Sequence, residues 1–337
     1  LGAAFEGAFR CCSASADAKR GLDMTMGRRS RFGWTAGLAA LCCSNAFSDW
    51  RAPREALDQR AAEGSVNVYF TRYGRDAFDA HKVSLLQAQL AAATLFFEQE
   101  LGLQSPLKMP RYQGQVRRID VHVLRLARGN GSAGDAAIHY RYRKFGEQEG
   151  RALTLTIGAH WEPPNLTPAH ELFHAYQYGY TFFKNPWFLE GLARSLENSM
   201  EGVSGAEAAL PRSMGEWQVF VRESYGAHLM WSRLMRLCEP ACKPVFKPFA
   251  KPCGAPLVKA TLEALGEVQA TVTKVRGLNP ADWPEDEQRN LANVPYMAQG
   301  LRSAIARACA TPRSEELQDF ERLLVQVADA SALEKTR

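Results

Sequence analysis

The chain has 337 residues, enough for one large domain or two smaller ones. Hydrophobic residues make up 46% of it and charged residues 23%, values close to those of ordinary globular proteins. This composition excludes a collagen, a coiled coil or an intrinsically disordered chain as the overall class. The formal net charge of +5 is far from that of a dedicated nucleic-acid binder, so we expect no nucleic-acid partner.

Residues 26–48 have the pattern of a secretory signal peptide. Three arginines precede an apolar run at 32–43, which ends in small residues. The run is too short to cross a bilayer, which takes about 20 residues. We therefore expect residues 1–48 to be upstream sequence and signal peptide. The mature chain is then expected to be secreted or periplasmic, without a stable membrane span. A buried N-terminal helix is the alternative.

Residues 49–182 are expected to form an α/β lobe and residues 183–337 a mostly helical C-terminal lobe. Hydrophobic alternation and periodicity in the first lobe predict, in chain order, a strand at 65–71, a buried helix at 79–102, and strands at 119–126, 136–143 and 151–158. After a pair of prolines the pattern becomes helical and stays so. The order indicates an α+β fold with a mixed sheet and a cleft between the two lobes.

The pattern at residues 170–174, His-Glu-Leu-Phe-His, carries the candidate chemistry. A helix is expected to begin at about Pro168, because proline is favoured at the first helical position. One turn then separates His170 and His174 on one face, where two neutral imidazoles can hold a zinc ion. Glu171 is rotated by about 100° from His170, so its carboxylate lies beside the metal and can accept a proton from metal-bound water.

A candidate third ligand, Glu190, follows on a second predicted amphipathic helix. The His-Glu-x-x-His pattern also occurs by chance, so a further ligand strengthens the hypothesis. A helix–turn–helix can bring Glu190 back to His170 and His174, which gives three protein ligands and one open position, as in catalytic zinc sites. Glu197 lies on the same helix face and can accept a hydrogen bond from a zinc-binding histidine. The alternative for Glu197 is a solvated surface charge.

Four of the eight cysteines lie beyond residue 48, three of them in the proline-rich segment 238–253. An even number in an exported chain suggests two disulfides, whose connectivity the sequence leaves open. The prolines exclude a regular helix there, so we expect the bridges to staple a long loop. A zinc site at these cysteines is the alternative, since a Cys-x3-Cys pair can bind zinc.

Two motifs together, His-Glu-x-x-His at 170–174 and Trp-Phe-Leu-Glu-Gly-x-Ala at 187–193, resemble those of the gluzincin metallopeptidases. The likeness is nearest to the peptidase-MA-like and aminopeptidase-N-like enzymes and covers roughly residues 151–234. It implies a zincin-like fold, in which a mixed sheet and an active-site helix are followed by a helical lobe. It also implies one Zn2+ per chain and a peptide or protein substrate.

The resemblance implies roles for residues around the metal as well. In this superfamily the strand before the active-site helix is an edge strand, along which the substrate lies antiparallel; Leu155, Ile157 and Gly158 match that strand. A tyrosine or histidine further along the chain stabilises the developing oxyanion. Tyr225 is the expected residue and His228 is the alternative.

The expected function is that of a secreted or periplasmic zinc metallopeptidase, a hydrolase of peptide bonds with Glu171 as general base. Two other functions remain open, a zincin-fold binding protein without turnover and a zinc amidohydrolase of a non-peptide amide. Three intact ligands together with Glu171 favour the active enzyme. Endopeptidase and exopeptidase activity are not distinguished.

Overall fold

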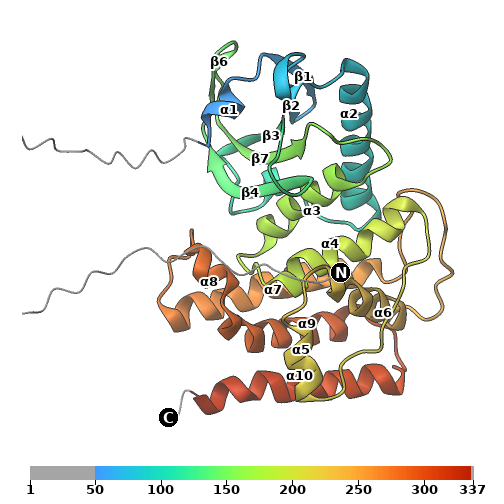
Figure 1. Ribbon diagram of the computed structural model, residues 1–337. Helices are drawn as coiled ribbons and strands as arrows, with labels where there is room; N and C mark the ends of the chain where they lie inside the picture. The colour runs from blue at the N-terminus through green and yellow to red at the C-terminus, as the bar shows by residue number, and fades with distance from the viewer. Residues whose placement is uncertain (1–49, 335–337) are drawn as a thin grey trace, which may run out of the picture. The chain divides into compact units, whose positions relative to one another are not determined.

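A five-stranded mixed sheet followed in sequence by a helical region forms the part of the chain that the computed structural model describes, residues 50–334, with side chains to residue 329 (Figure 1). The predicted signal peptide lies outside these residues. The strands are β1 (Gln59–Glu63), β2 (Val66–Phe70), β3 (Val116–Leu124), β4 (Gly131–Ile138), β5 (Arg141–Tyr142), β6 (Gly146–Glu147) and β7 (Arg151–Gly158). The predicted α+β class is confirmed.

The strand order in the large sheet is β1-β2-β3-β7-β4. The strands β2, β3 and β7 are parallel, and β1 and β4 run antiparallel to their neighbours. Alternate residues of β3 and β7, such as Val121 and Leu155, pack in the main hydrophobic core, while His122 points to the other face. Because β7 lies between two strands, it is buried along nearly its whole length.

The expectation that Leu155, Ile157 and Gly158 form an edge strand is therefore wrong. Leu155 pairs with Val121 of β3 on one side and with Ala133 of β4 on the other. The edge strand on this side of the sheet is β4, which begins at Gly131, earlier than the strand predicted at 136–143. The Gly-Ser-Ala-Gly start of β4 has low β-propensity, so the first half of this strand is not recognisable from the sequence.

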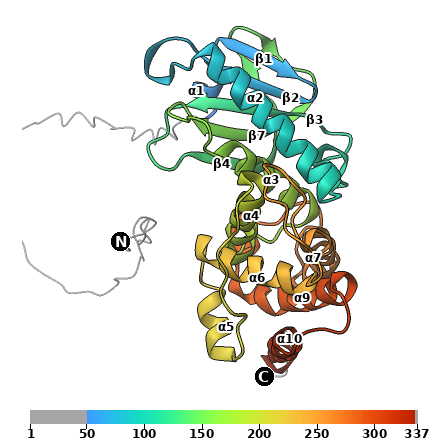
Figure 2. The ribbon, with the colours of Figure 1, turned by 90° about the vertical axis from the view of Figure 1, so that its right-hand side faces the viewer.

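Helices α2 (Ala80–Leu95) and α3 (Thr167–Tyr180) contact one another, and α3 also contacts β4 and β7 (Figure 2). The helix α2 continues into a π-helical segment, Phe96–Glu100. On the other face of the sheet, α1 (Ala52–Glu55) and the β5–β6 pair cover a second, smaller cluster. Short 3-10 segments are η1 (Gly74–Asp76) and η3 (Pro106–Lys108).

That second cluster surrounds a buried polar network. The hydroxyl of Tyr142 donates to Asp120 over 3.0 Å and lies 2.8 Å from Nε2 of His122. Arg118 and Asn67 also hydrogen-bond to Asp120. Burial lowers the pKa of the His122 imidazole to about 3, and the positive charge of a nearby arginine acts in the same direction, so the ring is neutral at physiological pH.

The chain after α3 is helical, as predicted. Its elements are α4 (Pro186–Glu201), α5 (Met214–Phe220), η4 (Tyr225–Ala227), α6 (His228–Cys238), α7 (Ala255–Arg276), α8 (Glu285–Arg289), η5 (Leu291–Asn293), α9 (Val294–Ala308) and α10 (Glu315–Glu334). Residues 50–334 belong to one compact unit. Among them no helix has the length and apolar character that a membrane crossing requires.

The four cysteines beyond residue 48 form two disulfides. Cys242–Cys253 closes a loop between α6 and α7, which has no regular helix, as the prolines predicted. Cys238–Cys309 instead links the end of α6 to the residue after α9. Both pairings fit an oxidising compartment, and they leave none of the four thiols to bind zinc.

Candidate metal centre

The helices α3 and α4 carry the candidate ligands, and a short turn at 181–185 folds one helix back toward the other. Pro186 is the first residue of α4, a position whose N–H would have no partner within the helix, so proline is tolerated there. Gln177 of α3 fastens the junction, because its Nε2 donates to the carbonyl oxygen of Leu189 over 3.1 Å. The two helices therefore meet at the level of His174 and Glu190.

Three metal-binding side chains converge in this place, namely His170, His174 and Glu190. Their ligand atoms all lie within 4.8 Å of one another, and no other group of this kind occurs in the described part of the chain. Oε2 of Glu190 is 3.2 Å from Nε2 of His170 and 3.5 Å from Nε2 of His174. Both histidines are buried, and burial alone would raise the pKa of Glu190, but the two imidazoles hold it below its usual range.

The Nδ1 atom of each histidine faces an oxygen. Glu197 Oε1 lies 2.6 Å from Nδ1 of His170, and Gln177 Oε1 lies 2.8 Å from Nδ1 of His174. A carboxylate or an amide oxygen can only accept, so Nδ1 carries the proton in a neutral ring and Nε2 keeps its lone pair. With both Nε2 atoms deprotonated, three acceptors would face one another, an arrangement that a cation stabilises; with a proton on Nε2, an imidazole instead donates to Glu190, and this is the interaction that lowers the pKa of that carboxyl group.

Glu197 thus occupies the supporting position that the helix spacing predicted, while Gln177 was not singled out from the sequence. Its position three residues after His174, on the same helix face, is the signal that could have identified it. The sequence motifs likewise assigned no function to Arg194. Its guanidinium donates to the second oxygen of Glu197, so that this carboxylate is held from two sides.

Glu171 lies beside the ligands without joining them. Burial raises the pKa of its carboxyl group, although the two histidines oppose the change. The backbone of β4 passes so close that a Cβ on Gly131 would lie 2.7 Å from Cγ of Glu171 and 2.6 Å from Cγ2 of Thr167. Only glycine leaves room there for the carboxylate.

Tyr225 lies in η4 at the border of the same site. Its ring centroid is 6.0 Å from that of His170, and its side chain is half exposed. Burial and the neighbouring Glu190 carboxylate raise the pKa of Tyr225 above its usual value, so the hydroxyl remains a hydrogen-bond donor. The imidazole of the alternative residue, His228, contacts its own helical turn instead: its Nδ1 lies 2.7 Å from the carbonyl oxygen of Tyr225.

A cavity of about 450 Å³ opens on this centre. It is bordered by the turn before β4, by the start of α3, by one face of α4 and by η4. Its lining includes His170, Glu171, Arg194, Glu197 and Tyr225. A substrate in this cavity would contact the general-base candidate and the tyrosine together.

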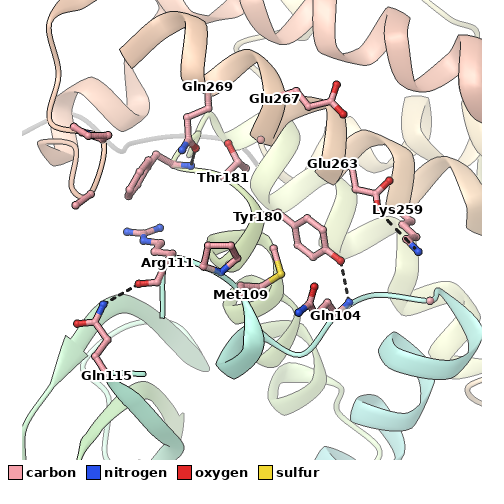
Figure 3. Close-up of a pocket in the computed structure, with 17 residues that line it drawn as sticks. Gln104, Met109, Arg111, Gln115, Tyr180, Thr181, Lys259, Glu263, Glu267 and Gln269 are labelled. Carbon is pink, nitrogen blue, oxygen red and sulfur yellow. Dashed lines mark hydrogen bonds and ion pairs between the residues drawn. The ribbon is translucent and has the colours of Figure 1, made fainter. Parts of the chain in front are cut away.

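A larger cavity, about 920 Å³, lies at the other end of α3 (Figure 3). Its walls come from the segment around Arg111, from the end of α3 and from α7. The charged groups that Figure 3 labels there are already engaged: Lys259 pairs with Glu263, Glu267 pairs with Arg307, and Arg111 donates to Asp135 of β4. Because no metal-ligand group converges in it, we place the candidate chemistry in the smaller cavity.

The edge strand β4 is anchored at this far end. Asp135 accepts from Arg111 over 2.5 Å and lies 3.0 Å from Nζ of Lys184, which also pairs with Glu285 of α8. Burial alone would raise the pKa of Asp135, but the two cations hold it below its ordinary value. The strand is therefore held at two places, at Gly131 against α3 and near its middle at Asp135, by Arg111 and Lys184.

Comparison with known proteins adds no relative to this geometry. No protein-family model, no curated protein and no solved structure matches the chain.

Proposed function

We propose that the protein is a zinc-dependent peptidase. The observation that carries the proposal is the convergence of His170, His174 and Glu190, with a buried Glu171 beside them, at the wall of a cavity. Two imidazoles and one carboxylate with a position left for substrate are the ligand set of catalytic zinc sites, whereas structural sites use four protein ligands. The gluzincin resemblance of the two motifs agrees with this reading.

The donor set fits zinc in its protonation as well as in its composition. Hydrogen bonds from Nδ1 to Glu197 and Gln177 direct both Nε2 lone pairs toward Glu190. Such outer partners raise the basicity of ligating histidines and fix their rings. When bound, zinc supplies Lewis acidity and makes water a stronger acid.

Within that centre, Glu171 takes the proton of the attacking water and passes it to the amine that leaves. A raised pKa suits this task, because the carboxylate must accept a proton and then release it near neutral pH. Tyr225 donates its hydroxyl proton to the developing oxyanion. Both groups line the same cavity, which supports a joint action on one substrate.

The edge strand β4 is the surface along which an extended peptide would lie. One side of β4 pairs with β7, and among the described strands none pairs with its other side. Its small side chains, in the sequence Gly-Ser-Ala-Gly-Asp-Ala-Ala-Ile, suit strand addition, although the carbonyl oxygen of Asp135 already accepts from the Tyr112 hydroxyl. This role replaces the one expected for Leu155, Ile157 and Gly158.

The test is the variant Glu171→Gln, assayed on a broad peptide library by mass spectrometry, with zinc measured by atomic absorption. The variant is expected to bind about one zinc per chain and to lose hydrolysis by at least a hundredfold, because an amide cannot accept the proton. A matched control is Glu149→Gln, at an exposed position outside the cavity.

Full activity of Glu171→Gln would contradict the mechanism. Wild-type protein that binds zinc but cleaves no peptide would contradict the peptidase proposal and favour a binding protein or a hydrolase of another amide.

A further inference from the structure

The loop between α6 and α7 has features that the proposed peptidase site does not use. Residues 242–253 read Cys-Lys-Pro-Val-Phe-Lys-Pro-Phe-Ala-Lys-Pro-Cys, so the pair Lys-Pro occurs three times within a segment that a disulfide closes. We call residues 242–253 the Lys-Pro loop. In Figure 1 it runs along the right-hand side, beyond the end of α4.

The tip of the Lys-Pro loop exposes two neighbouring apolar side chains. Val245 is 56% exposed and Phe246 is 59% exposed. Residues 243–248 are all exposed, and Val245 and Phe246 also border a surface groove of about 140 Å³ beside the end of α4. Two adjacent exposed apolar side chains on a fixed loop form a small apolar patch that is available for a contact outside the chain.

Three lysines surround this tip. Lys243, Lys247 and Lys251 are exposed, and among the described residues none of their ammonium groups has an ion-pair partner. The nearby acid Glu207 is paired with two arginines of α6 and so does not neutralise them. The loop therefore presents positive charge around an apolar point.

The backbone holds the tip in this exposed position. Phe249 turns inward, where its ring packs 6.2 Å from that of Phe96, and its N–H donates to the carbonyl oxygen of Met200. To do so Phe249 adopts φ 58°, a left-handed conformation that is unfavourable for a residue with a side chain. Gly202 at the end of α4 lies so close that a Cβ there would be 2.6 Å from the carbonyl carbon of Lys247. The tip is thus preorganised, which lowers the entropy cost of binding.

We propose that the Lys-Pro loop docks the protein on the surface of an anionic lipid bilayer. The lysines contact lipid phosphates, and Val245 and Phe246 enter the boundary between headgroups and acyl chains. A bilayer accepts a projecting apolar tip without a preformed pocket, and a nucleic acid offers no apolar phase for these side chains. Gly202 lies twelve residues after Glu190 on one helix, about 18 Å along its axis, so docking would hold the candidate metal centre close to the membrane.

The test uses the purified chain with both disulfides intact and sedimentation with vesicles. Vesicles of phosphatidylcholine with 30% phosphatidylglycerol are expected to bind it at 50 mM salt, and pure phosphatidylcholine at least tenfold more weakly. Binding is expected to weaken in 0.5 M salt, because salt screens exposed charges. The double variant Val245→Ser/Phe246→Ser is expected to bind about tenfold more weakly at unchanged charge.

Replacing the three loop lysines by serine is expected to weaken binding about a hundredfold, since each lysine near an anionic surface contributes about fivefold. The matched control replaces three exposed lysines elsewhere, Lys108, Lys144 and Lys274, and is expected to retain most of the binding. Thermal unfolding of each variant checks the fold.

Three results would overturn the proposal: no binding to anionic vesicles, equal binding to neutral ones, or an equal loss in the control variant. Unchanged binding of the Val245→Ser/Phe246→Ser variant would also overturn it, because the contact would then be purely electrostatic. These results are independent of the peptidase assay.

Discussion

Removing the charge of Glu197 while keeping its shape tests how the metal centre is supported. In Glu197→Gln an amide replaces the carboxylate that lies 2.6 Å from Nδ1 of His170. The side chain of Glu197 is only 9% exposed, so solvent screens its interaction with the imidazole little. The amide must also place either its oxygen or its NH2 group toward Arg194, which now donates to the carboxylate. One of the two hydrogen bonds is therefore lost.

The expected magnitude follows from this geometry. Loss of an outer partner of a metal-binding histidine typically lowers metal affinity 10- to 100-fold, which corresponds to about 1.4–2.8 kcal/mol. We expect the upper part of that range, because Arg194 competes for the amide oxygen. The centre should still form, since His174 is already supported by an amide, that of Gln177.

Zinc affinity is measured by competition with a chelator of known affinity, and the unfolding of the metal-free protein is measured in urea. The result expected is weaker zinc binding with little change in the metal-free stability. A change in zinc affinity of less than twofold would refute the view that Glu197 supports His170. A large loss of metal-free stability would instead assign Glu197 a role in folding.

Two further predictions follow from residues away from the ligands. Gly131→Ala is expected to lower kcat at least tenfold at unchanged zinc content, because its Cβ would lie 2.7 Å from Cγ of Glu171. The control is Gly134→Ala, whose Cβ would meet no atom closer than 3.7 Å and which should cause a smaller loss. Equal losses in the two variants would contradict the steric explanation. His122→Gln is expected to flatten the pH dependence of stability. In the wild type, the pKa of His122 is about 3 in the folded chain and about 6.5 in the unfolded chain. The unfolded chain therefore binds the extra proton, and the stability of the wild type falls as the pH drops below 6.5. Between pH 8 and pH 5 the free energy of unfolding should fall by about 2 kcal/mol more in the wild type than in the variant, as measured by urea unfolding at both pH values; parallel profiles would contradict this.

Features set by local periodicity were predictable from the sequence, and features set by long-range pairing were not. The spacing of His170 and His174 fixes their common helix face, and Glu190 and Glu197 share another for the same reason. The position of β7 inside the sheet depends on its pairing with β4, which no local pattern encodes. Alternation of leucine and threonine in β7 predicts a strand, but it does not reveal that Thr154 and Thr156 are buried as well as the leucines.

The side chains that support the centre were harder to predict. Gln177 is an ordinary polar residue until the turn at 181–185 brings α4 against it. Gly131 gains its importance only because β4 crosses α3 at Glu171. The disulfide partners were also unpredictable, because Cys309 is distant in sequence from the other three cysteines.

The two ends of the Gln177 amide have a joint consequence. Its oxygen orients the ring of His174, while its nitrogen holds the first turn of α4 through Leu189. A metal ion that binds the oriented ring of His174 therefore also stabilises the contact between α3 and α4. Metal binding and formation of this helix contact are thus thermodynamically linked. If the proposed function holds, a chelator is expected to weaken the α3–α4 junction as well as to inhibit hydrolysis.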